Sequence, residues 1–202
     1  MSGRRCALAV AAVAALALAL AGLPSVGNGL TASAEPRRAD AIVLTYGAMM
    51  LPEGLAEAEE LYRAGWAPTI VLSDFQIEQR GWDTDRVQPI ARRRLLRRGV
   101  PETALLPLAS TPTNELSEAE LLQELFAARG WGGVLLVVRD YRALRTTATL
   151  RRVAGGAPLE LIPRPVQSPD VSLSTWWTTP EGVTAVANEW PRIAFYRLRG
   201  WL

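Results

Sequence analysis

The fold of this chain is decided by residues 41–73, which read AIVLTYGAMMLPEGLAEAEELYRAGWAPTIVLS. The stretch begins with the apolar run Ala41–Tyr46 and ends with the apolar run Thr69–Ser73, both typical of strands buried on two faces. Between them, Glu53–Ala64 has the spacing of an amphipathic helix, and Gly65 follows where a C-terminal cap belongs. A strand, a helix and a second strand of this length predict a right-handed crossover between parallel strands.

The same alternation continues toward the end of the chain. Further strands are expected at Ala104–Leu108, Val134–Val138 and Leu159–Ile162, and further helices at Asp85–Arg98, Glu115–Arg129, Tyr141–Val153 and Pro180–Leu198. This pattern predicts an α/β fold, a three-layer sandwich with a mostly parallel sheet of about five strands. Residues 35–202 are long enough for one such domain with a single core.

The composition excludes several chemistries. The chain has 22 basic residues, all arginine, and it has no histidine and one cysteine. An imidazole base, a histidine-ligated metal and a lysine Schiff base are therefore absent. Cys6 lies in an apolar run and the acidic residues form no compact ligand motif, so no metal site is expected. From Glu35 onward, 20 arginines balance 20 acidic residues, which argues against nucleic acid as a partner.

An uncharged apolar run near the N-terminus predicts export. Residues 6–23 read CALAVAAVAALALALAGL and are preceded by two arginines. They are followed by the helix breakers Pro24, Gly27 and Gly29. Positive charge on the N-terminal flank predicts that residues 35–202 lie outside the cytoplasm. Residues 1–34 are then either a cleaved signal, with Ala32-Ser33-Ala34 as the small-x-small site, or a membrane anchor plus linker.

Polar and flexible residues follow the expected strands at the sheet edge where α/β proteins bind ligands. Gly47 follows the first strand, Ser73 and Asp74 follow the second, and Thr111 and Asn114 follow the third. The last two precede a helix, so they either cap its N-terminus or help to hold an anion there. Asp74 is either a ribose ligand or a turn residue, and the absence of a Gly-x-Gly-x-x-Gly pattern argues against a nicotinamide dinucleotide.

Three arginines follow the fourth expected strand and predict an anion site. Arg139, Arg142 and Arg145 carry guanidinium groups, which bind phosphate or carboxylate through paired hydrogen bonds. The alternative is a solvated face paired with acids such as Asp140. The loops after the third and fourth strands are expected to be neighbours, so that Arg145 and Thr111–Asn114 form opposite sides of one cleft.

A further basic cluster lies in the expected helix Asp85–Arg98. It comprises Arg92, Arg93, Arg94, Arg97 and Arg98. A solvated helix face is the simpler interpretation, and contact with anionic lipid is the alternative.

Five blocks in order resemble the YdcF/SanA/ElyC-like family, grouped as domain of unknown function 218. They are ADAIVLTYGA, AEELYRAGWAPTIVLSD, RRLLRRGVPETALLPL followed by STPTNELSEAELL, VLLVVRDYRALRTTATLRR, and TWWTTPEGVTAVANEWPRIAFYRLRGWL. The resemblance covers roughly residues 39–201. It implies a Rossmann-like α/β sandwich, export or membrane anchorage, and a role in cell-envelope maintenance. It also implies S-adenosylmethionine or another nucleotide-like molecule as a ligand, since one member is reported to bind S-adenosylmethionine.

The chain is a divergent member by this resemblance. The family's Tyr-His-x-x-Arg segment corresponds here to Tyr141 through Arg145, with Arg142 in place of the histidine. A permanently charged arginine replaces a titratable group, which suits binding better than proton transfer.

The sequence therefore predicts an exported, envelope-associated domain that binds a phosphorylated or nucleotide-like small molecule. The expected ligand residues are Gly47, Ser73, Asp74, Thr111, Asn114, Tyr141, Arg142 and Arg145. The alternative is an active enzyme that acts on a cell-wall or nucleotide-type substrate. Membrane contact is expected through residues 6–23 if they are not cleaved.

Overall fold

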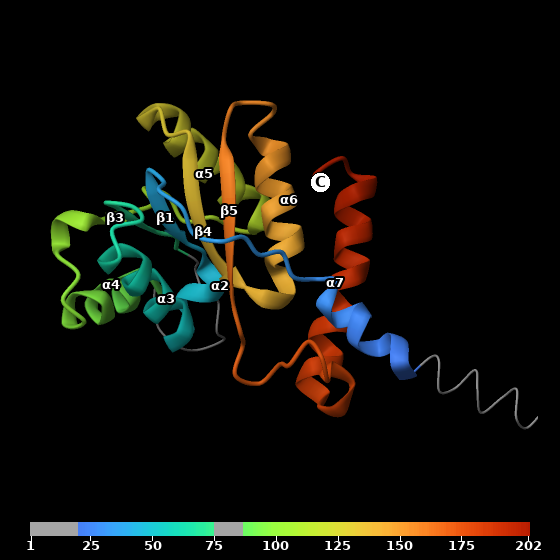
Figure 1. Cartoon of the computed structure of the whole chain (residues 1–202). Coiled ribbons are helices and arrows are strands. Elements are labelled where there is room, and N and C mark those ends of the chain that lie inside the picture. The colour runs from blue at the N-terminus through green and yellow to red at the C-terminus, as the bar shows by residue number, and fades with distance from the viewer. Residues whose placement is uncertain (1–19, 75–86) are drawn as a thin grey trace, which may run out of the picture.

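The computed structural model describes residues 20–74 and 87–202, and it confirms the predicted α/β fold. Five parallel strands form one sheet in the order β3-β2-β1-β4-β5 (Figure 1). The strands are β1 (Ala41–Leu44), β2 (Ile70–Leu72), β3 (Leu105–Pro107), β4 (Gly133–Arg139) and β5 (Glu160–Val166). β5 is longer than expected because it lies at the edge of the sheet, where its prolines are tolerated.

Helices occupy the connections between the strands. They are α2 (Tyr46–Met49), α3 (Pro52–Arg63), α4 (Val87–Arg97), α5 (Glu115–Arg129), α6 (Ala143–Val153) and α7 (Pro180–Leu198). Short 3-10 helices η1 (Glu102–Ala104), η2 (Asp140–Arg142) and η3 (Trp176–Thr178) precede β3, α6 and α7. The expected helices are confirmed within a few residues, except that residues 85 and 86 lie outside the described residues. Helix α2 was not expected, since a single turn leaves little periodicity in a sequence.

The glycines expected at helix ends have the conformation that this role requires. Gly65, Gly99 and Gly130 follow α3, α4 and α5 with φ angles of 74°, 88° and 64°. Only glycine adopts this left-handed conformation without strain, which is why it ends a helix so effectively.

The sheet is covered on both faces, as its continuous apolar strands predict. Ile42 and Leu44 face one layer, where they pack with α3 and α4. Ala41 and Val43 face the other layer, where they pack with α5 and α6. This alternation follows from the two-residue period of a strand and produces the three layers.

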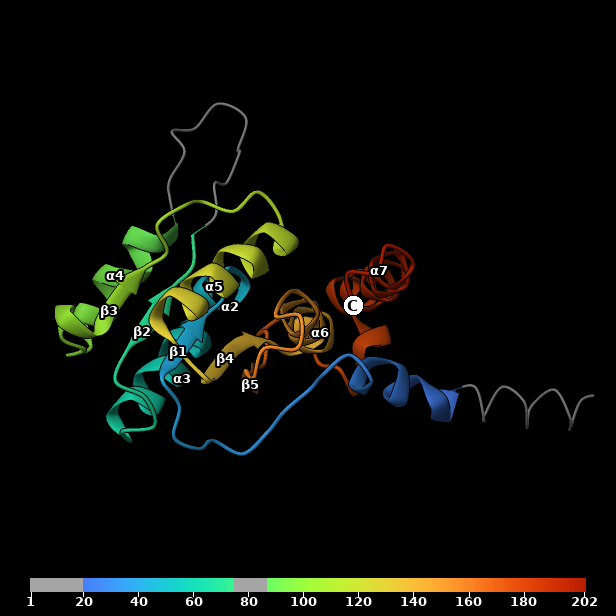
Figure 2. The same cartoon turned by 90° about the horizontal axis from the view of Figure 1, so that it is seen from above.

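Helix α7 forms an additional unit beside α6, as Figures 1 and 2 both show. It packs through a third apolar cluster, whose buried members are Leu30, Tyr141, Val171, Leu173, Val186 and Ile193. The cluster joins α7 to the turn after β4, to the loop after β5 and to the chain segment before β1.

That N-terminal segment is helical over residues 20–28, so the expected breakers Pro24 and Gly27 lie inside a helix. Gly27 has a packing role there, because a Cβ atom at this position would lie 2.1 Å from the carbonyl oxygen of Leu173. Trp176 Nε1 donates to the carbonyl oxygen of Leu23 at 2.8 Å, and Trp190 Nε1 donates to that of Val26 at 3.1 Å. The helix therefore packs closely against the region around η3 and α7.

The chain beyond this helix also contacts the domain. The backbone N–H of Leu144 donates to the Leu30 carbonyl oxygen at 2.9 Å, and that of Ala34 donates to the Pro163 carbonyl oxygen at 3.0 Å. The part expected to be a linker thus makes specific hydrogen bonds to α6 and β5. Within residues 20–74 and 87–202, no helix has the length and apolar character needed to span a membrane. Most of the apolar run, residues 6–19, lies outside the described part of the chain.

Candidate functional site

The sheet order corrects one expectation about the site. β3 and β4 are separated by β2 and β1, so they are not neighbouring strands. The segment after β3 reaches Arg145 only through Glu115 at the start of α5, and Arg145 is buried in that contact, so the prediction of one open cleft between neighbouring loops is wrong. The chain passes outward from β1 to β3 and then returns through α5 to place β4 on the other side of β1. The switch point of the sheet, where such folds usually bind ligands, therefore lies between β1 and β4.

Asn114, which follows β3 and was an expected ligand residue, instead begins helix α5. Asn114 is the N-cap of this helix: its side chain accepts a hydrogen bond from the Ser117 backbone N–H at 2.9 Å. In return, the Ser117 hydroxyl accepts from the Asn114 backbone N–H at 3.1 Å. This reciprocal capping box confirms the capping interpretation of Asn114.

Ser73, Asp74 and Thr111 lie together on the β2 side of the sheet. The Thr111 hydroxyl is 3.4 Å from Asp74 Oδ2, and the backbone N–H of Gln88 at the start of α4 is 3.5 Å from Asp74 Oδ1. Ser73 and Asp74 are both buried. The Asp74 carboxylate thus accepts from groups of the chain itself.

Arg145 is buried in an ion-pair network. Its guanidinium pairs with Glu189 of α7 and with Glu115 at the start of α5, the latter at 3.0 Å from Nη2 to Oε1. It also lies over the ring of Tyr196, 5.1 Å from the ring centre. Because the side chain is only 1% exposed, the structure places Arg145 in the contact between α5, α6 and α7 rather than in an open pocket.

The switch point itself is filled. Arg139 Nε donates to the carbonyl oxygen of Gly47 at 2.7 Å, which closes the crevice between β1 and β4. The space that remains is about 10 Å³, lined among others by Gly47, Glu118, Arg139 and Arg142. A volume of this size holds at most one water molecule.

Glu118 is a buried acid that the sequence analysis did not single out. Its Oε1 accepts a hydrogen bond from the backbone N–H of Tyr46 at 3.1 Å. Burial raises the pKa of Glu118, and the Ser73 hydroxyl, the Tyr46 N–H and the charge of Arg142 oppose that increase in part. Its position in the first turn of α5 is common for acids, so the sequence carried no signal that this one faces the sheet.

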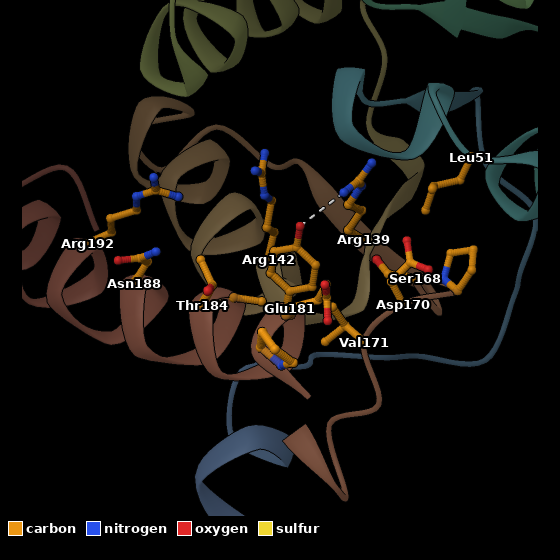
Figure 3. Close-up of a pocket in the computed structure, with 14 residues that line it drawn as sticks. Leu51, Arg139, Arg142, Ser168, Asp170, Val171, Glu181, Thr184, Asn188 and Arg192 are labelled. Carbon is orange, nitrogen blue, oxygen red and sulfur yellow. Dashed lines mark hydrogen bonds between the residues drawn. The ribbon is translucent and has the colours of Figure 1, made fainter. Parts of the chain in front are cut away.

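A pocket opens next to the switch point, between the turn after β4, the loop after β5 and helix α7. Its volume is about 510 Å³. It is lined by Arg139, Tyr141 and Arg142 from the turn, by Ser168 and Asp170 from the loop, and by Glu181, Thr184, Asn188 and Arg192 from α7, together with Leu51, Pro169, Val171, Pro180 and Ala185. Figure 3 shows the three arginines along one side of this pocket and Asp170 and Glu181 along the other.

Internal contacts hold these arginines in place without burying all of their donors. Arg139 Nη1 donates to the Tyr141 hydroxyl at 3.1 Å, the dashed line in Figure 3. The Arg142 guanidinium lies 5.6 Å from the centre of the Tyr141 ring and 3.6 Å from Glu115, and its buried Nε has no hydrogen-bond partner among the described residues. Arg192 is exposed and lies 3.6 Å from Glu189. Three guanidinium groups around one opening suit a small anion.

The structure thus divides the eight expected ligand residues into separate groups. Tyr141 and Arg142 line the large pocket. Gly47 lines the filled switch point, Arg145 lies in the ion-pair network, and Ser73, Asp74, Thr111 and Asn114 lie around the starts of α4 and α5. Arg192 and Asn188 were missed, since no local pattern shows which face of α7 borders a pocket.

Comparisons with known proteins add no assignment to this geometry. No family model matches the chain, and no curated protein matches it. Within the described residues, no cluster of three or more acidic, cysteine or histidine side chains is arranged to hold a metal ion.

Asp140 lies between two of the pocket residues and has an altered acidity. Its Oδ1 accepts a hydrogen bond from the Tyr141 backbone N–H at 2.8 Å. Burial raises the pKa of Asp140 to about 6, against the opposing effect of backbone hydrogen bonds and of Arg139. The folded chain therefore holds a proton that the unfolded chain releases near its ordinary pKa of 3.8.

Asp140→Asn should become stabilising as the pH rises. As the pH rises from about 4 to about 7, ionisation of Asp140 lowers the free energy of unfolding of the wild type. The reason is that the folded state binds the proton more tightly than the unfolded state. Asparagine keeps the acceptor and cannot ionise. We expect the variant to gain about 1–2 kcal/mol relative to wild type between these pH values, allowing for partial exposure. Melting temperatures at pH 4 and pH 7 measure this.

Asp170→Asn is the matched control, because Asp170 is exposed on the neighbouring loop. A change with pH that Asp170→Asn and Asp140→Asn share would not come from the burial of Asp140. An Asp140→Asn difference that is equal at both pH values would show that burial does not perturb this carboxyl.

Proposed function

We propose that this chain is an envelope-associated, YdcF-like α/β domain that binds a small phosphorylated or nucleotide-like molecule. The observation that carries the proposal is the convergence of Arg139, Arg142 and Arg192 on one pocket. The pocket volume of about 510 Å³ lies within the range of about 300–1,000 Å³ that is usual for small-molecule sites. The five sequence blocks support the family resemblance, and the α/β fold agrees with it.

The charge of the pocket supports a phosphorylated ligand over S-adenosylmethionine. Arginine binds phosphate oxygens through two parallel hydrogen bonds, and three arginines supply several such donors. The sulfonium of S-adenosylmethionine is positively charged, so only Asp170 and Glu181 on the far side would favour it. The residues present thus fit an anion better than a sulfonium.

Binding is better supported than catalysis. Glu118, a buried acid near the sheet edge, borders a space of only about 10 Å³, which leaves no room for a substrate. The pocket of about 510 Å³ has Arg142 where the resemblance expects a titratable histidine. A fixed cation binds an anion at every physiological pH but does not transfer protons.

A ligand panel tests the proposal. Adenosine diphosphate, pyrophosphate and S-adenosylmethionine are added to the full chain, and the melting temperature and calorimetric affinity are measured. We expect the two phosphate compounds to stabilise the fold through the pocket. Arg142→Ala and Arg192→Ala should each weaken that binding about ten- to a hundredfold, because a hydrogen bond to a charged group contributes roughly 1.5–3 kcal/mol.

Arg151→Ala is the control, since Arg151 is exposed on α6 and does not line the pocket. It should bind the phosphate compounds as the wild type does. The proposal fails if neither phosphate compound binds, or if Arg142→Ala and Arg192→Ala bind as tightly as Arg151→Ala.

A further inference from the structure

Exposed apolar side chains gather on one part of the molecule. Among the described residues, seven large apolar side chains are exposed, and six of them lie on α7 or on the helix of residues 20–28. The six are Leu20, Val26, Val183, Trp190, Phe195 and Leu198. These two helices lie next to each other, with Trp190 donating to the Val26 carbonyl oxygen. The apolar surface is therefore concentrated rather than scattered.

Helix α7 has three distinct faces. Gly182, Val186, Glu189 and Ile193 are buried against the domain. Glu181, Thr184, Asn188 and Arg192 border the pocket. The third face, which we name the outer stripe, consists of Val183, Ala187, Trp190, Ala194 and Leu198, all exposed. Spacings of three and four residues place these five on one side of the helix.

The outer stripe is apolar along its whole length and has basic neighbours. Leu198 is 88% exposed, although an isolated helix face in water would favour a polar residue there. At the C-terminal end of the helix, the exposed charged residues are Arg197 and Arg199, while Arg192 belongs to the pocket face. From Val183 to Arg199 the one acid, Glu189, is buried. Aliphatic and aromatic side chains beside arginines, with no exposed acid, are typical of helices that lie on anionic membranes.

The basic helix α4 has different properties. Arg92 pairs with Glu102 and Arg98 pairs with Glu59, so acids of the chain neutralise part of its charge. None of the exposed large apolar side chains is on α4. Charge without apolar contact gives a weaker and more salt-sensitive attachment to lipid.

The direction of the neighbouring helix agrees with a membrane on this side. In Figures 1 and 2, α7 lies at the edge of the molecule, and the helix of residues 20–28 points outward past it. The sequence that leads into this helix is the uncharged apolar run of residues 6–23. An apolar run that enters a bilayer would bring the outer stripe close to the surface of the same bilayer.

We infer that the outer stripe of α7 lies on an anionic lipid surface, parallel to the membrane plane. This inference rests on the envelope association in the proposed function and specifies the face that makes the contact. The pocket residues project from a different side of α7, so lipid on the outer stripe leaves the pocket open.

Single-site labelling of the full chain tests the inference. The environment-sensitive fluorophore NBD is attached to Leu198→Cys in a Cys6→Ser background, and the chain is mixed with vesicles of phosphatidylcholine containing phosphatidylglycerol. Nitroxide-labelled lipids quench a fluorophore that contacts the bilayer. Arg93→Cys on α4, also with Cys6→Ser, is the matched site on the other basic surface. We expect strong quenching at position 198 and little at position 93.

One double variant in the labelled background tests the charge. Arg197→Ser with Arg199→Ser should reduce the ratio of attached to detached α7 about thirtyfold on anionic vesicles, taking about 1 kcal/mol for each arginine. On pure phosphatidylcholine vesicles, the same pair should have little effect. Equal quenching of the double variant and its parent on anionic vesicles would overturn the electrostatic part of the inference.

The native Cys6, labelled in the otherwise unchanged chain, separates this inference from the proposed envelope association. Quenching at position 6 without quenching at position 198 would leave the association intact and overturn the inference about α7. Quenching at position 93 instead of position 198 would also overturn it. If Leu198→Cys chains cross-link in pairs and their label is not quenched by lipid, the outer stripe is a contact between two copies, and the inference is wrong.

Discussion

Replacing Arg145 with alanine should lower the free energy of unfolding by about 3–5 kcal/mol. The guanidinium pairs with Glu189, whose side chain is as buried as that of Arg145 itself, and with Glu115. Removal of the arginine leaves the Glu189 carboxylate buried beside an exposed Arg192 that lies 3.6 Å away. An uncompensated charge in a poorly solvated site is among the largest single costs that a substitution can impose.

Denaturant unfolding of the wild type and of the variant measures this loss. Arg151→Ala on the same helix is the control, because Arg151 is exposed and should change stability by less than about 0.5 kcal/mol. Arg145→Met combined with Glu189→Leu should recover most of the loss, since an apolar pair of similar volume often replaces a buried ion pair without cost. A loss below about 1 kcal/mol for Arg145→Ala would show that the network is solvated.

This expectation assigns Arg145 a different role from the one its place in the sequence suggests. Its position after β4 favoured contact with an external anion, whereas the structure supplies that negative charge from Glu115 and Glu189. The arginine thereby joins α5, α6 and α7. Since α7 forms one side of the pocket, Arg145 positions pocket residues through α7 without lining the pocket.

Leu30→Ala should cost about 2–5 kcal/mol, which is the range for truncating a fully buried leucine. Leu30 is 0% exposed and packs with Tyr141, Val186 and Ile193. The alanine would leave a cavity between the N-terminal segment and α7. We also expect faster proteolysis within residues 20–34, because the apolar contact that holds this segment is weakened.

Unfolding experiments and timed protease digestion of the full chain measure both effects. Leu20→Ala is the control, because Leu20 is 51% exposed and its truncation should change stability by less than about 0.5 kcal/mol. If Leu30→Ala leaves stability and digestion unchanged, residues 20–34 behave as the simple linker that the sequence suggested.

The helices and strands were predicted well, because the residues that mark them lie close together in the sequence. Helix α7 has the expected bounds Pro180–Leu198, and α5 begins after the Asn114 cap and ends before Gly130. The apolar runs correctly marked the five parallel strands. Caps and periodicities depend on residues only three or four apart, so they can be recognised along a single stretch of chain.

The arrangement of these helices and strands in space determined which residues come together at the candidate site. Only the sheet order shows that β2 and β1 separate β3 from β4, and only the packing of α5 and α7 next to α6 brings two acids to Arg145. The pocket likewise needs α7 beside the turn after β4. The sequence by itself determined the fold class, the helix ends and the arginines available for an anion. The tertiary structure alone decided which arginines face the pocket, because that depends on packing between residues far apart in the chain.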